Sequence, residues 1–473
     1  MAAHVLVRRL IQRAALALAC SGPMLVVAQE TSAPQPAPSE LELTLPQAQQ
    51  VMQHALGTGQ SDLARTLAYG LLQADARSGI AHYSLAVAEG QLDRPKPAQR
   101  AAAKAYRFAQ GQLQHFEAAQ LAARMSYMAR RPTRTQLWLR RAMQHAPNER
   151  IEAQLERDYR QVRAQNPLSF SIRGGLRPSS NVNNGADSGL QIIDGLPYVG
   201  TLSGNAQALS GVIAHADGRI AYRLGGSKSS RTEIAARLYV KRAALDGDAK
   251  TLAPGSRNRD FGSTYGTIGL SHAFAWGARK DVSRIGLQLG QYHIGGRRSY
   301  DFARLDAAQH WRLDRGASVT LNAGVELRES AFGNRFDTQV LSLGLGSRHH
   351  LRNGDAVSFA LNLQKADGDL ANARSQGVAL SAGYSLNKQI GPAILSGGVT
   401  LAHVDYPKYT AFFAVPGGRQ DLSASAHLDM LFPDLDYAGF APNLRLTTSR
   451  TTSNVSRFKT KELSVALGIQ SKF

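Results

Sequence analysis

Cysteine is almost absent from this sequence of 473 residues, since the chain has a single one, Cys20. It lies in an apolar stretch, residues 14–28, that follows three arginines and ends in the small residue Ala28. This arrangement is typical of a secretory signal peptide, 1–28. We expect cleavage after Ala28, which leaves no cysteine and therefore excludes disulfides and cysteine-ligated metal sites. A membrane anchor and lipidation at Cys20 are the alternatives for this segment.

Long apolar runs and charged residues are also scarce. Beyond residue 28, no uninterrupted apolar stretch reaches the ~20 residues of a spanning helix, which argues against a helical membrane protein. Charged residues make up only 19% of the chain, whereas 44 residues are glycine, a mixture that favours β-structure with many bends. Acidic residues are the scarcer sign, so the net charge is +20, and an anionic lipid or an acidic partner becomes plausible.

The first part of the mature chain has a helical pattern. A short proline-rich linker, 29–40, precedes a segment, 41–166, in which apolar residues recur three and four apart, as in Leu63, Leu67 and Leu71. Small residues recur at intervals of 37, namely Ala68, Ala105 and Ala142. This period is close to the ~34 residues of tetratricopeptide (TPR) repeats. We predict a TPR-like helical-repeat domain, with an irregular helical domain as the alternative.

From residue 167 to 473 the apolar period changes to two. Apolar side chains alternate with polar or small ones, as in the series Val319, Leu321, Ala323, Val325 and Leu327. We count about fourteen such strands, joined by connections that are alternately long and short apart from the fifth, 295–299, which is short although its position predicts a long one. This pattern predicts an antiparallel transmembrane β-barrel of the Gram-negative outer membrane, with the helical domain in the periplasm. A soluble β-sandwich is the alternative.

The last strand ends in an aromatic residue. Leu463, Val465, Leu467 and Ile469 alternate with small and polar residues, so one face would contact lipid. Gly468 and Phe473 match the barrel-insertion signal of outer-membrane proteins, a terminal aromatic residue with a glycine five positions before it. We therefore expect the barrel-assembly machinery to be a partner, as well as membrane lipid and lipopolysaccharide.

Motifs for catalysis are missing. The adjacent His349 and His350 would point to opposite faces of a strand, so they cannot share a metal. No phosphate-binding loop with its lysine is present. The basic residues are spread along the chain and do not cluster with aromatic residues, which argues against nucleic acid. We expect no catalytic, cofactor-binding or metal residue and a monomer that is not an enzyme.

Two short motifs resemble one family. The stretch 176–189 contains an S-N-x-N core, Ser180, Asn181 and Asn183, and the stretch 452–473 has Ser453 and Asn454 before the last strand. With helical repeats before a barrel of about fourteen strands, they resemble the surface lipoprotein assembly modulator family, the outer-membrane translocon of type XI secretion.

This resemblance implies that the chain moves a client protein from the periplasm to the cell surface. The client would be a surface lipoprotein or a secreted haem- or metal-scavenging protein, engaged by the helical repeats. The main alternative is a passive porin or ligand channel with a periplasmic adaptor domain, and the second is an outer-membrane enzyme.

Overall fold

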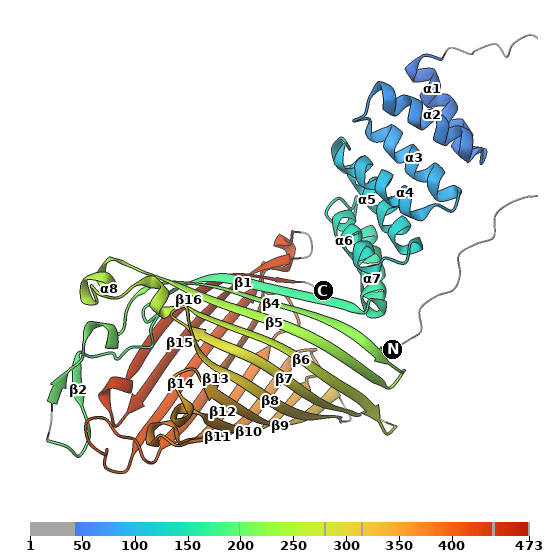
Figure 1. Cartoon of the computed structure of the whole chain (residues 1–473). Helices are drawn as coiled ribbons and strands as arrows, with labels where there is room; N and C mark the ends of the chain where they lie inside the picture. Colours follow the sequence, from blue (N-terminus) through green and yellow to red (C-terminus); the bar gives the residue numbers. More distant parts are fainter. Residues whose placement is uncertain (1–42, 198, 279–280, 314–315, 438–439, 472–473) are drawn as a thin grey trace, which may run out of the picture.

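A computed structural model describes residues 43–473 except 198, 279–280, 314–315, 438–439 and 472–473. The expected signal peptide and linker, 1–40, and Phe473 therefore lie outside the described residues. The described chain starts with seven helices in antiparallel succession, drawn in blue and cyan in Figure 1. They are α1 (Leu45–Gly57), α2 (Ser61–Ala74), α3 (Gly79–Gln91), α4 (Pro95–Arg107), α5 (Gly111–Met128), α6 (Pro132–Met143) and α7 (Glu149–Gln165).

Alanine dominates the core of this helical domain. Ala68, Ala105 and Ala142, the residues predicted from the interval of 37, are all buried, on α2, α4 and α6 respectively. A small side chain there lets neighbouring helices approach closely. The predicted leucine stripe is wrong at one position, because Leu63 is 44% exposed and Ala64 is buried in its place. The inward face of α2 is formed by Ala64, Ala68 and Leu71.

The turns within the three helix pairs share one backbone geometry. Gly59, Asp93 and Arg130 have positive φ angles of 76°, 52° and 54°, and each lies two residues before the second helix of its pair. The next residue's amide then donates to a carbonyl five residues back, as from Arg94 to Glu89. This is the left-handed helix ending that satisfies otherwise unpaired carbonyls. The repetition confirms helical repeats of the TPR type.

Fourteen strands then form a closed antiparallel barrel in which β1 pairs with both β4 and β16. The strands are β1 (Leu168–Ser179), β4 (Gly211–Gly226), β5 (Ser230–Leu245), β6 (Ser263–Trp276), β7 (Asp281–Ile294), β8 (Arg297–Arg312), β9 (Ala317–Ser330), β10 (Thr338–His350), β11 (Ala356–Gly368), β12 (Ser375–Ser385), β13 (Ile394–Tyr406), β14 (Arg419–Leu431), β15 (Phe440–Ser453) and β16 (Thr460–Ser471). A separate hairpin, β2 (Leu190–Ile192) and β3 (Val199–Thr201), lies in the first loop.

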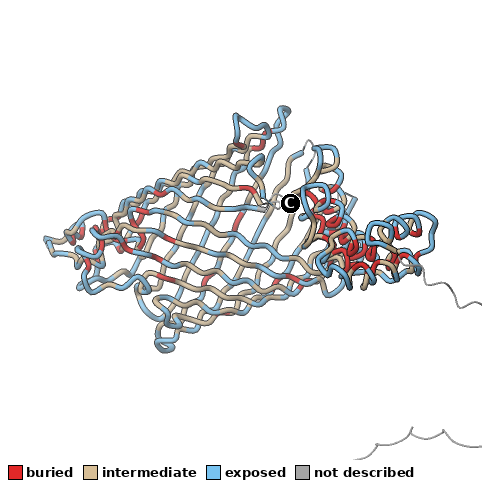
Figure 2. Tube along the Cα trace, turned by 90° about the horizontal axis from the view of Figure 1, so that it is seen from above, coloured by how far each residue is buried: buried red, intermediate tan, exposed pale blue. Residues whose placement is uncertain are grey.

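The barrel wall exposes its apolar side chains on the outside. Leu321, Val325 and Leu327 of β9 are exposed, as are Leu463, Val465, Leu467 and Ile469 of β16. Figure 2 shows that buried residues gather in the helical domain and in the loops, whereas the wall is exposed or half-buried. An apolar outer band on a closed sheet suits lipid, because every strand can satisfy its backbone within the sheet. The predicted fold class is thereby confirmed, with an outer-membrane type of barrel.

The two ends of the barrel differ. The connections at one end, the short-turn end, are compact, whereas the other end, the long-loop end, carries the hairpin β2–β3 and the helix α8 (Gly247–Leu252). The helical domain stands at the short-turn end, where α7 leads into β1 (Figure 1). At this end Arg223 of β4 donates two hydrogen bonds to the junction of α7 and β1. Its side chain donates to the carbonyl of Ala164 and its amide to the carbonyl of Pro167. Among the described residues, no helix has both the length and the apolar character to cross a membrane.

Candidate functional site: the barrel lumen and its two ends

Among the charged side chains that line the lumen, three groups each place two arginines around one carboxylate. Asp217 accepts from Arg237 at 2.8 Å and lies 3.9 Å from Arg173. Glu233 bonds Arg219 and Arg231. Glu326 accepts from Arg328 at 2.6 Å and lies 3.6 Å from Arg304. Along each strand these charged residues alternate with the exposed apolar residues of the outer face. All three groups, here called the arginine triads, therefore face inward.

A pocket of about 260 Å³ lies among the triads of β1, β4 and β5. Its wall carries the guanidinium groups of Arg173, Arg219, Arg237 and Arg284, with Asp217 as the carboxylate. Gly269 and Gly286 form part of its floor, where an added Cβ would come within 2.9 Å of a neighbouring strand's side-chain atoms. The pocket is therefore a positively charged depression in the lumen wall.

The S-N-x-N residues of the first motif shape the loop 180–210 at the long-loop end. The side chain of Asn181 donates to the carbonyl of Gly185 (2.9 Å) and accepts from the amide of the same residue (2.7 Å). Asn183 donates to Gln207 (2.7 Å) and accepts from the amide of Leu209 (2.9 Å). Both asparagines satisfy backbone groups that the loop would otherwise leave unpaired.

The second motif ties a different pair of loops. Asn454 accepts from the amide of Gln420 (2.8 Å) and donates to the carbonyl of Gly418 (2.7 Å), and Ser453 accepts from the amide of Val455 (3.1 Å). Ser180 of the first motif accepts from the amide of Leu463 on β16 at 3.2 Å. The structure therefore brings the two motifs, about 270 residues apart in sequence, to the same end of the barrel beside the β1–β16 seam.

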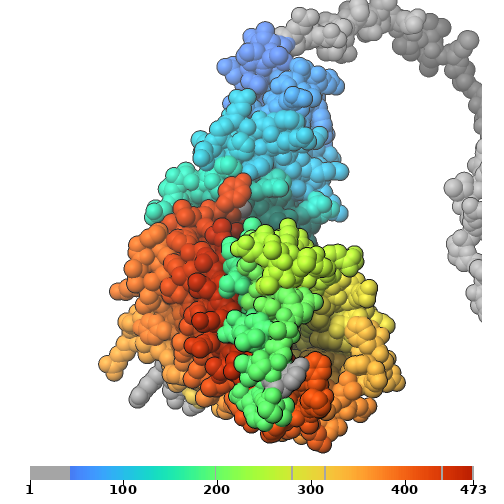
Figure 3. Space-filling model, turned by 90° about the vertical axis from the view of Figure 1, so that its left-hand side faces the viewer, coloured from blue at the N-terminus to red at the C-terminus, as the bar shows by residue number. Residues whose placement is uncertain are grey.

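The loop 180–210 lies across the mouth of the barrel, as its green segment shows in Figure 3. Ile193 pairs with Val455, the hydroxyl of Ser456 bonds the backbone of Leu190 and Ile192, and the amide of Asp194 donates to Asn454. Ile193, Val415 and Val455 form a small buried apolar cluster. We call this interlocked set of loops, 180–210, 407–418 and 454–459, the loop cap.

Arg419 holds the loop cap from below. Its guanidinium pairs with Asp421 at 2.6 Å and lies 3.3 Å from the centre of the Phe458 ring and 4.0 Å from that of Tyr406. The side chains of Arg419 and Asp421 are only 12% and 11% exposed. Cation–π contacts and a desolvated ion pair thus join β14 to the loops on either side.

We predict that Arg419→Ala loosens the loop cap. Removing one partner of a largely buried ion pair leaves the other charge uncompensated, which costs about 3–5 kcal/mol. Trypsin added to the inserted protein should cleave the loops 407–418 and 454–459 faster than in the wild type. Arg335→Ala is the matched control, since Arg335 also lies over a ring, that of Phe336 at 4.8 Å, but is exposed and outside the cap. Equal cleavage rates in all three proteins would contradict the prediction.

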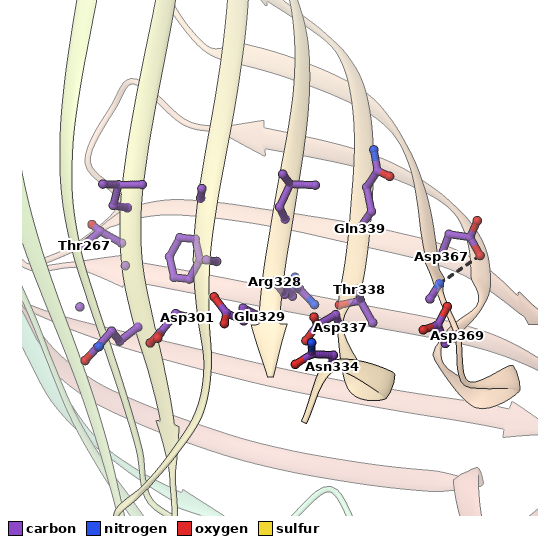
Figure 4. A pocket seen from close by; sticks show the side chains of 18 of the residues that line it. Thr267, Asp301, Arg328, Glu329, Asn334, Asp337, Thr338, Gln339, Asp367 and Asp369 are labelled. Carbon is purple, nitrogen blue, oxygen red and sulfur yellow. Dashed lines mark hydrogen bonds between the residues drawn. The ribbon is translucent and has the colours of Figure 1, made fainter. Parts of the chain in front are cut away.

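Acidic residues gather at the long-loop ends of β6–β11, around an open concavity of about 1420 Å³. Figure 4 shows Asp301 on β8, Glu329 on β9, Asp367 on β11, and Asp337 just before β10. Register and alternation place Asp301 and Glu329 on the outer face, with Leu327. Nowhere in the described parts of the chain do three or more His, Cys, Asp or Glu side chains form a group that could hold a metal.

A cleft of about 670 Å³ separates the helical domain from the turn between β14 and β15. Tyr106, His115 and His145 line it from the helices, and Asp436 and Tyr437 from the turn. Burial lowers the pKa of His145, and the stacked His115 ring lowers it further, whereas burial raises the pKa of Tyr106. Tyr106 and His145, which share a hydrogen bond of 3.2 Å, therefore face the barrel across this cleft.

A groove of about 330 Å³ runs along α1, α3 and α5 of the helical domain. Leu56, Ile80 and Tyr83 give it apolar surface, and Gln53, Gln114 and Glu117 give it polar groups. Burial raises the pKa of Tyr83, and the carboxylate of Glu117 raises it further. An apolar floor with amide groups along its edge suits an extended peptide.

Of the two residues predicted to form the barrel-insertion signal, Gly468 lies within the described residues and Phe473 lies outside them. Gly468 pairs with Gly175 at the seam, and an added Cβ would meet the Asn443 side chain at 2.8 Å and the Gly174 carbonyl at 3.1 Å. Close packing at the seam therefore favours glycine there, apart from any role in insertion. The arginine triads are what the sequence analysis missed; arginines with the period of the lumen face were the available signal.

No protein-family model and no curated protein matches this chain. Among solved structures, a BenF-like porin from Pseudomonas fluorescens Pf-5 is 9% identical, with a TM-score of 0.36 over 64% of this chain and 99% of the porin. OccAB3 of Acinetobacter baumannii is 10% identical, with a TM-score of 0.35 over 64% of this chain and 98% of that one. The type III secretion translocator chaperone SycD of Yersinia enterocolitica is 11% identical, with a TM-score of 0.24 over 26% of this chain and 88% of the chaperone. At these identities and scores, no argument about function follows.

Proposed function

We propose that the chain is an outer-membrane translocon that moves a client protein from the periplasm to the cell surface. One observation carries the proposal: a helical domain with a peptide-sized groove stands at one mouth of a barrel whose other mouth is covered by an interlocked cap. A passive pore needs neither part. In this proposal the groove collects the client, the lumen conducts it and the cap parts to release it.

The helical domain is coupled to the barrel through side chains as well as through the chain itself. Arg140 of α6 donates to the hydroxyl of Tyr159 and lies 4.9 Å from the Phe440 ring at the start of β15. Arg223 of β4 bonds Ala164 at the end of α7. These contacts hold the domain beside the mouth, so a client bound to it would have a short way to the lumen.

The orientation in this proposal places the helical domain in the periplasm and the loop cap at the cell surface. Short turns on the periplasmic side and long loops outside are the rule for outer-membrane barrels. The resemblance stated above names the class of client: a surface lipoprotein or a secreted haem- or metal-scavenging protein. We propose no catalytic step, and the energy for transport would come from folding of the client outside or from a partner.

The test is the location of the client when this protein is missing. Cells that lack it should retain one specific exported protein in the periplasm, measured by protease accessibility and fractionation, while uptake of small solutes stays unchanged. Restoring the full chain should return the client to the surface.

A passive porin or ligand channel is the second candidate, favoured by the charged lumen of a closed barrel. It predicts the reverse pattern: steady conductance of the purified barrel in planar bilayers, altered solute uptake and no mislocalised protein. That result would refute the translocon.

A further inference from the structure

The lumen presents positive charge far more than negative charge. In the three arginine triads the carboxylates of Asp217, Glu233 and Glu326 are only 11–14% exposed, whereas their six arginines are 31–68% exposed. Each carboxylate lies against the wall beneath two guanidinium groups. Each triad therefore carries a net charge of +1 and shows almost only arginine to the lumen.

Arg284 adds an uncompensated charge to the same region. It lines the pocket with Arg173, Arg219 and Arg237, is exposed, and has no acidic partner among the described residues. The surroundings offer hydrogen-bond donors but little bulk, because Thr267, Ser271 and the two floor glycines lie beside it. A guanidinium group that has no acidic partner and lies in a depression can bind an oxyanion.

The arginines of the triads and Arg284 share the inner face of the wall. Asp301 and Glu329 lie on the outer face near the long-loop end, while the arginines lie on the inner face of β1, β4, β5, β7, β8 and β9. Part of the positive charge of the chain therefore faces the lumen, where a substance passing through the barrel would meet it.

We propose that this lumen surface binds the carboxylates of an acidic polypeptide segment during passage. The inference rests on the proposed function, because it names the chemistry of the client segment that the barrel accepts. Asp217 and Arg237 show the geometry, since two parallel bonds of 2.8 and 2.9 Å join them. A glutamate or aspartate of the client would form the same fork with an arginine of a triad, or with Arg284.

At the pocket, a polypeptide fits better than a nucleic acid or an acidic polysaccharide. The residues lining the pocket include no aromatic ring on which a base or a sugar could stack. Several weak binding sites in series also suit passage, because a segment must leave each site as readily as it binds there. Arginine keeps its charge at any physiological pH, so the surface stays positive.

The direct test measures binding of a fluorescein-labelled glutamate-rich peptide of about 15 residues to the full chain in detergent micelles, by fluorescence anisotropy. We expect saturable binding at low salt that weakens as salt is added, since screening reduces exposed charge pairs. A lysine-rich peptide of equal length should not bind. The double variant Arg173→Gln/Arg284→Gln should bind about tenfold more weakly. Neither arginine has a short ion pair, so the barrel should still fold, as heat-modifiable migration on a gel would show.

The control Arg450→Gln/Arg242→Gln removes the same charge from the outer face of β15 and β5, and its affinity should equal that of the wild type. Absence of binding, equal binding of the lysine peptide, or equal loss of affinity in the control would overturn the inference. Binding of dextran sulfate as tightly as of the glutamate peptide would overturn the choice of polypeptide. Export of the client in cells separates the two proposals: normal export without peptide binding refutes this inference alone, whereas peptide binding without any exported client refutes the translocon.

Discussion

The double substitution Ile193→Cys/Val455→Cys is expected to abolish export of the client until a reductant is added. The two residues face each other in an antiparallel bridge, and the amide of Asp194 donates to the carbonyl of Asn454. That bond marks Ile193 and Val455 as a non-hydrogen-bonded pair, in which the Cα atoms lie about 4.5 Å apart. This separation lies within the range that a disulfide spans.

The physical reason for so large an effect is that the cap covers the exit. The loop 180–210 is joined to the loop 454–459 by the Ile193 cluster and by Ser456, so it can swing aside only if these contacts part. Hydrogen bonds and apolar contacts of this kind open reversibly, whereas a covalent bond does not. Export should fall at least about tenfold in the oxidised protein.

Surface protease accessibility of the client, with and without reductant, is the measurement. Each single-cysteine variant should export normally under both conditions, which also reports any disulfide with Cys20, the native cysteine. Unchanged export in a fully oxidised double variant would show that the client does not pass beneath this loop.

Deletion of residues 41–166 is expected to leave a barrel that inserts but exports little. Closure of the barrel depends on the β1–β4 and β1–β16 pairings, which begin after that segment. The barrel would lose the exposed hydrogen bond from Arg223 to Ala164, worth about 1 kcal/mol. It would also lose the contact of Arg140 with the Phe440 ring, worth about 0.5–1 kcal/mol, and the two losses together are too little to unfold it. Insertion is measured by heat-modifiable migration, and export by the amount of client at the surface.

A point variant tests the groove without removing the domain. Ile80→Glu places a charge in the apolar groove of α1, α3 and α5, and should lower export in the same direction as the deletion. Leu63→Glu is its control, because Leu63 is exposed on α2 and lies outside the groove. Wild-type export by either the deletion or the groove variant would argue against a receptor role for the helical domain.

Local periodicity was enough to predict the architecture. A period near 3.6 up to residue 166, an interval of 37 between Ala68, Ala105 and Ala142, and a period of two afterwards each follow from neighbouring residues. The alternation also indicated which residues of β16 face outward, because successive side chains of a strand must point to opposite faces. These features depend on near neighbours in the chain, so the amino-acid sequence by itself determined them.

The contacts between distant segments were decided only by the tertiary structure. The sequence indicates that Arg173, Asp217 and Arg237 face the same side of their strands, but the register that places Arg173 opposite Asp217 depends on how β1 closes onto β4. The hydrogen bond from the amide of Asp194 to the carbonyl of Asn454 likewise forms only when the barrel is closed. Closure of the barrel brings together residues that lie far apart in the sequence, and periodicity gives no information about such pairs. The fold could therefore be predicted from the sequence, whereas the triads and the cap could not.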